Sequence, residues 1–353
     1  MENKNKKKKK KKYNKVLTYS IRTGIVLLTT VLLLLIFVIG ICFILVHGPS
    51  EAAKNHFVCA LHETSAMKWV PNLFLSQEEY DQIVNKNLMV DVAEGTVSDT
   101  SLIEIGKDND NEDDKKEEIP ELELIDITGD TFKGKMLIVK DPSRVFVGTV
   151  PQFYEGTGKV VQELCEQYDA VAGINGGEFV DMGSYSYSAM PVGLVISEGQ
   201  LKMGSMDETY NVTGFTNDNI LVVGKMTARE AIDMGIRDCV HTLHTTGPFL
   251  IIDGEPLTVP DTTVYGGGKN PRTAIGQRAD GAILLLVVDG RQAESIGATF
   301  KDMTYIMMEY GAVNASCMDG GTSTQMVYEG EVVNKPYSPS GPRRCPTAFL
   351  VKY

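Results

Sequence analysis

The chain has 353 residues, 43% of them hydrophobic, which is enough for more than one folded unit with a substantial apolar core. Its net charge of −12 is unevenly distributed. Residues 1–23 hold ten Lys or Arg and one acid, Glu2, so the rest holds 24 basic against 45 acidic residues, a net charge of −21. A body so acidic excludes nucleic acid as the partner, because neutralising phosphates needs clustered Lys and Arg. The six cysteines include no CxxC pair, which excludes a disulfide scaffold and a structural zinc site.

An uncharged apolar segment, Gly24–Val46, follows the basic arm 1–23. At 1.5 Å per residue a helix of this length spans about 34 Å, so it can cross a bilayer with a slight tilt. The competing interpretation is a cleaved signal peptide, whose apolar core is usually about 7–15 residues before a small-residue cleavage site. Here His47-Gly48-Pro49 follows the longer run. We therefore expect an uncleaved transmembrane helix in the cell membrane, with the N-terminus cytoplasmic and the C-terminal domain extracellular.

Two segments separate the expected transmembrane helix from the main domain. Residues 47–93 are expected to form a partly helical stalk, because Ser76–Lys86 opens with Ser76 and Glu79 in capping-box spacing. Residues 94–120 are polar and acidic, and we expect them to be a solvated linker.

A run of Asp, Asn and Glu within this linker, from Asp108 to Asp114, superficially resembles a calcium-binding loop. An EF-hand needs Gly at its sixth position, where Asp113 stands, and an acid at its twelfth, where Ile119 stands. We therefore reject an EF-hand and keep the linker interpretation.

The sequence pattern of residues 121–353 is typical of a folded domain, with short apolar runs, turns and two clear helices. Thr157–Asp169 is apolar at i, i+3, i+4 and i+7 from Val161, and Thr299–Tyr310 has a methionine stripe and ends at Gly311. Strands are expected at Met136–Lys140, Val145–Gly148, Pro191–Ile196, Phe249–Ile252 and Ala282–Val288. The last of these is uninterruptedly apolar, as expected of a strand covered on both faces. The pattern predicts an α+β fold, a mixed β-sheet domain with packed helices, preceded by one transmembrane helix.

Three apolar strands end in turns of one kind, in which a hydrogen-bond acceptor is followed by glycine. The turns are Asn175-Gly176-Gly177-Glu178 after Val171–Ile174, Asp289-Gly290-Arg291 after Ala282–Val288, and Asp319-Gly320-Gly321-Thr322-Ser323 after Val313–Met318. Glycine permits positive φ and lets backbone N–H groups approach a ligand closely. A single turn of this kind would be structural, but three predict strand ends that converge around one pocket.

A fourth segment brings in positive charge. The run Gly266-Gly267-Gly268 leads to Asn270-Pro271, which presents Arg272 and Thr273 just before a hydrophobic strand. Arg272 and Arg291 are the expected anion ligands, because a guanidinium offers a planar bidentate fork for phosphate or carboxylate. The alternative is that either arginine pairs structurally with a nearby Asp.

Six blocks that contain these motifs resemble, in order, the phosphodiester glycosidase family. The blocks are Val160–Phe179, Pro191–Leu201, Gly247–Leu257, Asn270–Gly276, Leu284–Arg291 and Gly311–Val327. The resemblance covers about 125–353 and implies a glycosidase that cleaves sugar-phosphate diesters, in a bacterial, membrane-anchored branch related to exopolysaccharide. Two positions depart from the family pattern: Glu178 replaces an aromatic residue or Gly, and Thr322 replaces a third Gly. The role of Glu178 is therefore not implied by the resemblance.

The chemistry of a sugar-1-phosphodiester suggests a role for each candidate. A phosphate leaving group needs less protonation than an ordinary aglycone and more charge neutralisation by arginine. We expect Asp289 and Asp319 to activate water or stabilise the oxocarbenium ion, with Glu178 as a third catalytic candidate. The expected substrate-binding residues are Asn175 (for a sugar hydroxyl), Gly176, Gly177, Arg272, Thr273, Arg291, Gly320, Gly321, Thr322 and Ser323. Either Asp may instead accept N–H bonds within its own turn.

Other reactive residues are interpreted as packing. Cys239, His241 and His244 have loose metal-like spacing without a fourth ligand, and Cys317 occupies an apolar strand position. The sequence neither requires nor excludes a disulfide between Cys317 and Cys345. The sequence requires no cofactor, and it leaves a divalent metal open without giving support for one.

Two rival functions also remain at this point. One is a non-catalytic binder of envelope polysaccharide, and the other is a glycosyl-phosphate transferase. The expected partners are thus a glycan or sugar-phosphate substrate and the membrane, with protein partners unknown.

Overall fold

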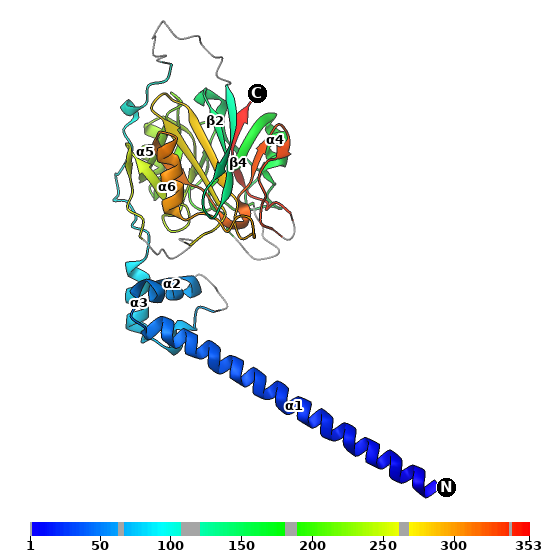
Figure 1. The fold of residues 1–353 in the computed structure, drawn as a ribbon. Coiled ribbons are helices and arrows are strands. Elements are labelled where there is room, and N and C mark those ends of the chain that lie inside the picture. Colours follow the sequence, from blue (N-terminus) through cyan, green and yellow to red (C-terminus); the bar gives the residue numbers. More distant parts are fainter. Residues whose placement is uncertain (1, 63–66, 107–120, 181–188, 261–267, 339–340) are drawn as a thin grey trace. The chain divides into compact units, whose positions relative to one another are not determined.

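The computed structural model describes residues 2–62, 67–106, 121–180, 189–260, 268–338 and 341–353 (Figure 1). The chain divides into two compact units, Met1–Lys86 and Asn87–Tyr353. The second unit begins at Asn87, ahead of residue 121, where the sequence predicts the main domain to start. The calcium-like run from Asp108 to Asp114 falls outside the described residues.

The regular elements described in the first unit are all helices. It consists of α1 (Glu2–His47), α2 (Glu51–His62), the 3₁₀ turn η1 (Pro71–Leu73) and α3 (Gln77–Lys86). The basic arm and the apolar segment are one continuous helix, α1. Its stretch Thr18–His47 contains an 18-residue window with a mean hydropathy of 3.2 and is long enough to cross a membrane. A signal sequence shares that length and composition. The expected cap of α3 is confirmed, since Ser76 N–H donates to Glu79 Oε2 and Glu79 N–H donates to Ser76 Oγ.

The described residues of the second unit form three sheets, and all their strand pairs are antiparallel. The first sheet is β1 (Leu122–Thr128), β2 (Lys133–Val139), β13 (Ile283–Val288), β12 (Arg272–Arg278), β14 (Ala312–Cys317), β10 (Phe249–Ile252) and β11 (Glu255–Pro256), in that order. The second sheet is β16 (Glu331–Val332), β15 (Met326–Tyr328), β4 (Ala170–Asn175), β17 (Thr347–Lys352) and β3 (Val145–Thr149). The third sheet is β6 (Gln200–Met203), β5 (Val195–Ser197), β9 (Ile236–His241), β7 (Thr209–Thr216) and β8 (Leu221–Thr227).

Three helices complete this unit: α4 (Val161–Tyr168), α5 (Ala228–Asp233) and α6 (Phe300–Glu309) (Figure 1). Thr299 caps α6 in a full capping box with Asp302, as the spacing requires, and Gly311 follows with φ +81°. The α+β fold is confirmed. One expected strand is shorter than the pattern suggested, because Gly193 has φ +73° and breaks the extended backbone between Pro191 and β5.

The central strand β13 explains how the layers hold together. Its alternate residues Leu284, Leu286 and Val288 belong to a core shared with α6, and Ile283, Leu285 and Val287 belong to a core shared with the second sheet. All six are buried. The uninterrupted apolar run in the sequence thus reflects a strand covered on both faces, as expected.

The segment ahead of the first sheet is part of this unit. Gly95 N–H donates to Lys225 O at 2.9 Å, and Ser98 N–H donates to Val223 O at 3.0 Å. Because β8 is the edge of the third sheet, its backbone groups need a partner, and these residues supply it. The described part of the expected linker, 94–106, is therefore packed on the domain rather than solvated along its whole length.

Candidate active site

The central position belongs to the first residue of β12, Arg272. β13 and β14 lie on either side of β12 and are both antiparallel to it, so their C-terminal ends meet at its beginning. Arg272 is opposite Val288 in one ladder, and Ala274 is opposite Cys317 in the other. Antiparallel pairing therefore brings the turns after β13 and β14 to the same place as the arginine.

The turns themselves are in contact. Gly290 and Gly320 both lie so close to Pro271 that a Cβ on either would collide with its backbone. The turn after β4 joins them, because Asp319 N–H donates to Gly176 O at 3.2 Å. The three acceptor–glycine turns and the start of β12 are thus contiguous, which is the arrangement that the strand ends predicted.

Asn175 holds two sheets together with one side chain. Its Nδ2 donates to Asp319 O at 2.7 Å, and its Oδ1 accepts from Thr273 Oγ1 at 2.8 Å and from Gln325 N–H at 3.2 Å. Both Asn175 and Thr273 are fully buried. The contacts described for Asn175 are with protein groups, and its expected contact with a sugar hydroxyl stays a prediction. Asn175 and Thr273 act as positioning residues in this geometry.

Glu178 is a buried carboxyl group with two protein donors. Leu243 N–H donates to its Oε2 at 3.0 Å and Thr246 Oγ1 donates to its Oε1 at 2.8 Å, and only 6% of the residue is exposed. Burial, followed by the nearby charge of Asp319, raises its pKa to about 8 against the opposing effect of the two donors. Its raised pKa favours the protonated form of Glu178 at neutral pH, and the nearby charge of Asp319 contributes to this.

The side chain of Arg272 is held rigidly at the start of β12. Its Nε donates to Ala298 O at 3.2 Å, its Nη2 donates to Gly268 O at 2.8 Å, and its guanidinium lies 3.9 Å from the centre of the Phe300 ring. The residue is 4% exposed. Such a fixed, stacked guanidinium is suited to holding an anion in one orientation.

Two further arginines lie around this cluster. Arg291 is exposed, with Nε and Nη2 both bonded to Asn270 Oδ1, so it pairs with an amide rather than with an Asp. Arg343 donates to Thr322 Oγ1 at 3.1 Å and its guanidinium stands 5.1 Å from the centre of the Phe179 ring. Sequence reasoning missed Arg343. The clue to its position was that Arg343 comes just before the final strand, β17. This strand pairs with β4 in the antiparallel sense, so it begins at the end of the sheet where the turn after β4 lies.

Several expected backbone donors are already used inside the protein. Gly321 N–H donates to Pro271 O at 2.9 Å, Gly176 N–H to Thr347 O at 3.0 Å, and Ser323 N–H to Gly320 O at 3.2 Å. Gly177 packs against the backbone carbonyl of His241. The glycines at these turns thus allow close packing of the chain segments, and their expected role in binding substrate stays a prediction.

Asp289 differs most from expectation. Its Oδ1 accepts from Asn334 Nδ2 and from Lys335 N–H, both at 2.9 Å, and the residue lines a separate pocket of about 260 Å³. Neither Arg272 nor Asp319 is among the described residues of that pocket. Burial raises the pKa of Asp289 and these donors lower it. Although its backbone belongs to the contiguous turns, its carboxyl group is engaged in tying down the segment around Lys335.

The remaining reactive residues have separate surroundings. Cys239 lies in the core of the third sheet, His241 Nδ1 is 3.2 Å from Asn211 O, and His244 Nδ1 is 3.7 Å from Asp91 Oδ2. Cys317 and Cys345 are buried free thiols, and burial raises the pKa of both. Among the described residues no group of three or more His, Cys, Asp or Glu is placed to hold a metal ion.

Comparison with known protein families identifies the class to which this fold and this cluster belong. The family model described as phosphodiester glycosidase matches residues 168–352, and the chain belongs to that family. The matched region begins later than residue 125, where the resemblance was expected to start, and it contains Arg272, Glu178 and Asp319.

Individual relatives agree with this family. A SPbeta prophage-derived uncharacterized protein, YomE of Bacillus subtilis (strain 168), is 35% identical over 143 residues, 38% of this chain and 22% of that protein. The N-acetylglucosamine-1-phosphodiester alpha-N-acetylglucosaminidase of Mus musculus is 25% identical over 224 residues, 59% of this chain and 42% of that protein. The chain thus spans less than half the length of these curated relatives.

A solved structure shows the same fold. The zebrafish N-acetylglucosamine-1-phosphodiester alpha-N-acetylglucosaminidase catalytic domain, auto-inhibited by its pro-peptide, is similar with a TM-score of 0.55 and 22% identity. The match covers 67% of this chain and 85% of that one. The likeness supports the architecture described above.

Replacing Asn175 tests whether it joins the sheets. Asn175→Ala leaves Asp319 O, Thr273 Oγ1 and Gln325 N–H without their partner, so we expect a loss of about 3–5 kcal/mol in the free energy of unfolding. Urea unfolding followed by circular dichroism measures it. Thr273→Val, which removes one of the three bonds, should cost about 1 kcal/mol. Equal losses in the free energy of unfolding of the two variants would contradict the role of Asn175 in joining the two sheets.

The raised pKa of Glu178 predicts a pH-dependent stability. Because the folded state holds the proton up to about pH 8, whereas an ordinary Glu loses it near 4.5, stability decreases as pH rises through this window. The decrease is at most about 1.4 kcal/mol per pH unit for one proton. Glu178→Gln removes this dependence, so its melting temperature minus that of the wild type should be larger at pH 8 than at pH 5. The exposed Glu331→Gln is the control, and a constant difference for Glu178→Gln would refute the assignment.

Proposed function

We propose that the chain is a membrane-anchored extracellular hydrolase that cleaves the glycosidic bond of a sugar-1-phosphodiester in a cell-envelope or exopolysaccharide glycan. The observation that carries the proposal is the convergence of Glu178, Asp319 and Arg272 at contiguous strand ends, inside the region that matches the family. Family membership supports glycosidase chemistry on phosphodiesters, and the relatives' printed activity supports an amino sugar as one candidate substrate.

The two carboxyl groups have environments that suit different tasks. Glu178 keeps its proton at neutral pH, so it adds no negative charge that would repel an incoming phosphate. Its proton is available to the bridging oxygen as the bond between that oxygen and sugar C1 breaks. Asp319 is the group that accepts the proton of the water whose oxygen bonds to C1, or that stabilises the oxocarbenium ion before the attack. Arg272 balances the charge on the departing phosphate.

The N-terminal helix supports the anchored part of the proposal. Thr18–His47 is apolar and exposed, and ten Lys or Arg precede residue 24. A basic flank on one side of an apolar span places that side in the cytoplasm. The domain that follows would then face a medium in which envelope glycans are accessible.

Substitution of Asp319 tests the catalytic proposal. With the full chain and a panel of glycosyl-1-phosphodiesters, release of free sugar should fall at least about a hundredfold in Asp319→Asn, because the group that accepts the proton is lost. Glu178→Gln should fall similarly. Asp289→Asn is the matched control, and we expect it to retain activity within about tenfold, because its carboxyl oxygen is bonded to Asn334 and Lys335.

Three results would overturn the catalytic proposal. Equal losses in the Asp319 and Asp289 variants would remove the distinction between the two turns. Polymer binding without turnover of any diester would favour a non-catalytic polysaccharide-binding protein. Appearance of a lengthened or decorated acceptor in place of free sugar would favour a glycosyl-phosphate transferase.

The proposed topology has its own test. In intact cells that express the chain with an epitope tag at each end, external protease should remove the C-terminal tag and leave the N-terminal tag protected. Permeabilised cells are the control, in which both tags should be lost. Recovery of a free C-terminal fragment in the medium, with the N-terminal helix cleaved off, would instead identify a signal peptide.

A further inference from the structure

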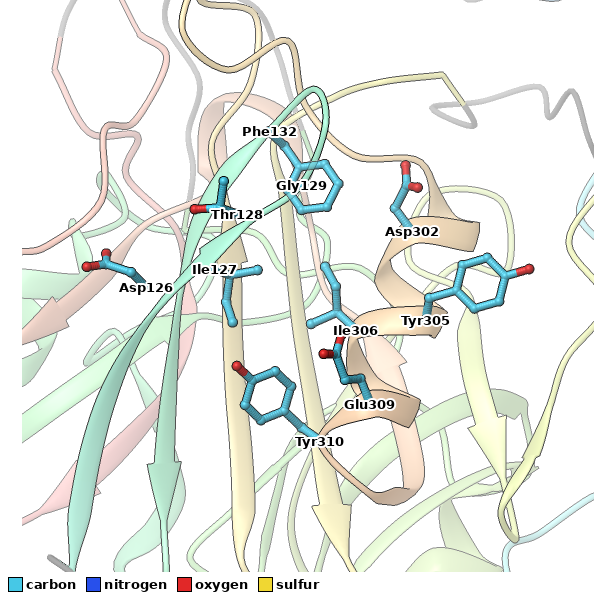
Figure 2. A pocket seen from close by; sticks show the side chains of 10 residues that line it. All are labelled: Asp126, Ile127, Thr128, Gly129, Phe132, Asp302, Tyr305, Ile306, Glu309 and Tyr310. Atoms are coloured by element: carbon cyan, nitrogen blue, oxygen red, sulfur yellow. The ribbon is translucent and has the colours of Figure 1, made fainter.

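A groove separate from the candidate active site lies between α6 and the hairpin of β1 and β2 (Figure 2). Its volume is about 450 Å³, within the range of small-ligand pockets. Figure 2 shows Ile127 and Ile306 between the Phe132 ring near one end and the Tyr310 ring near the other. The groove therefore has an apolar floor with aromatic rings at its ends.

The rim is polar and comes largely from one face of α6. Asp302, Ile306 and Glu309 are spaced at i, i+4 and i+7, so they line the same side of the helix, whereas Met303 and Met307 point into the core. Tyr305 lies beside them and is 58% exposed. Thr128 adds a hydroxyl group from the opposite wall. These groups are mostly hydrogen-bond acceptors, which suits a ligand rich in hydroxyl donors.

The charge of the groove restricts the ligand. Its described lining includes Asp126, Asp302 and Glu309 and neither Lys nor Arg. Asp126 forms an ion pair with Lys135, whose Nζ is 2.6 Å from Asp126 Oδ1. The two carboxylates of α6, those of Asp302 and Glu309, lie at the groove margin, where no Lys or Arg is among the described lining residues. A phosphate or a uronic acid would be repelled here. The same surface tolerates an uncharged polyhydroxylated ligand.

We infer that this groove binds an uncharged sugar unit of a glycan chain, at a position distinct from the residues proposed to hydrolyse the diester. The half-buried ring of Tyr310 supplies flat apolar contact for the C–H face of a pyranose, whereas the ring of Phe132 is mostly covered by the core. Carboxylate and hydroxyl oxygens accept the O–H groups of the sugar. None of the described lining residues belongs to the Glu178–Asp319–Arg272 cluster. The inference rests on the proposed function only in taking a glycan as the ligand. A second sugar-binding position would hold a polymer on the domain while a diester elsewhere in it is cleaved.

The test is direct titration of the full chain, in a detergent without a sugar headgroup, with chitotriose, maltotriose and mannotriose. Calorimetry should show saturable binding of at least one of them below about 10 mM, and trigalacturonate should not bind. Glu309→Ala and Tyr305→Ala should weaken that binding about tenfold, since both lie at the margin and neither is buried. Met308→Ala is the matched control, because Met308 is exposed on the same helix but is not part of the groove.

The outcomes separate this inference from the proposed function. Failure of all three neutral trisaccharides to bind, equal binding of trigalacturonate, or unchanged affinity in both variants would each overturn the sugar-binding groove. Release of sugar from a short glycosyl-1-phosphodiester should be unaffected by Glu309→Ala and Tyr305→Ala, because neither residue belongs to the cluster proposed to hydrolyse the diester. Trisaccharide binding that persists in a wild-type chain without turnover would refute the hydrolase and leave the groove intact.

Discussion

The candidate active site depends on one buried amide. Asn175 ends a strand of the second sheet, and its side chain bonds to Thr273 of the first sheet, to the carbonyl of Asp319 and to the N–H of Gln325. In a buried setting each of these groups would be costly to leave unpaired. The position of Asp319 relative to Arg272 is therefore fixed by the packing of two sheets, and small movements between those sheets would be felt directly at the catalytic groups.

The ionisable side chains near Asn175 differ in their electrostatic surroundings. Glu178 has two hydrogen-bond donors but is so deeply buried that desolvation dominates and the proton stays on. Arg272 is held by two carbonyls and an aromatic ring, which fix the position of its charge. A site that must hold a phosphate and cleave the bond beside it gains from this combination, because a positive charge is fixed while one of the nearby carboxyl groups remains neutral.

Much of this arrangement could be predicted from local sequence, and the remainder follows from contacts distant in the chain. The apolar run of β13 indicated a strand with two covered faces, and the spacing of Thr299 and Asp302 indicated the start of α6. Repetition of an acceptor followed by glycine correctly indicated that the turns meet. It did not indicate where each side chain points: Asp289 and Asp319 begin nearly identical turns, yet Asp289 is bonded to Asn334 and Lys335. The loop that binds Glu178, through Leu243 and Thr246, lies about 65 residues away and carries no recognisable pattern.

The pairing of residues 95–98 with β8 affects how the domain could be studied in isolation. A chain shortened to begin at residue 121 would lose these residues and leave the backbone of Leu221–Thr227 exposed along the edge of its sheet. Open edges of that kind favour association between molecules through added strands. Such a fragment would tend to self-associate in solution, whereas one that begins at Asn87 retains the covering segment and a closed sheet edge.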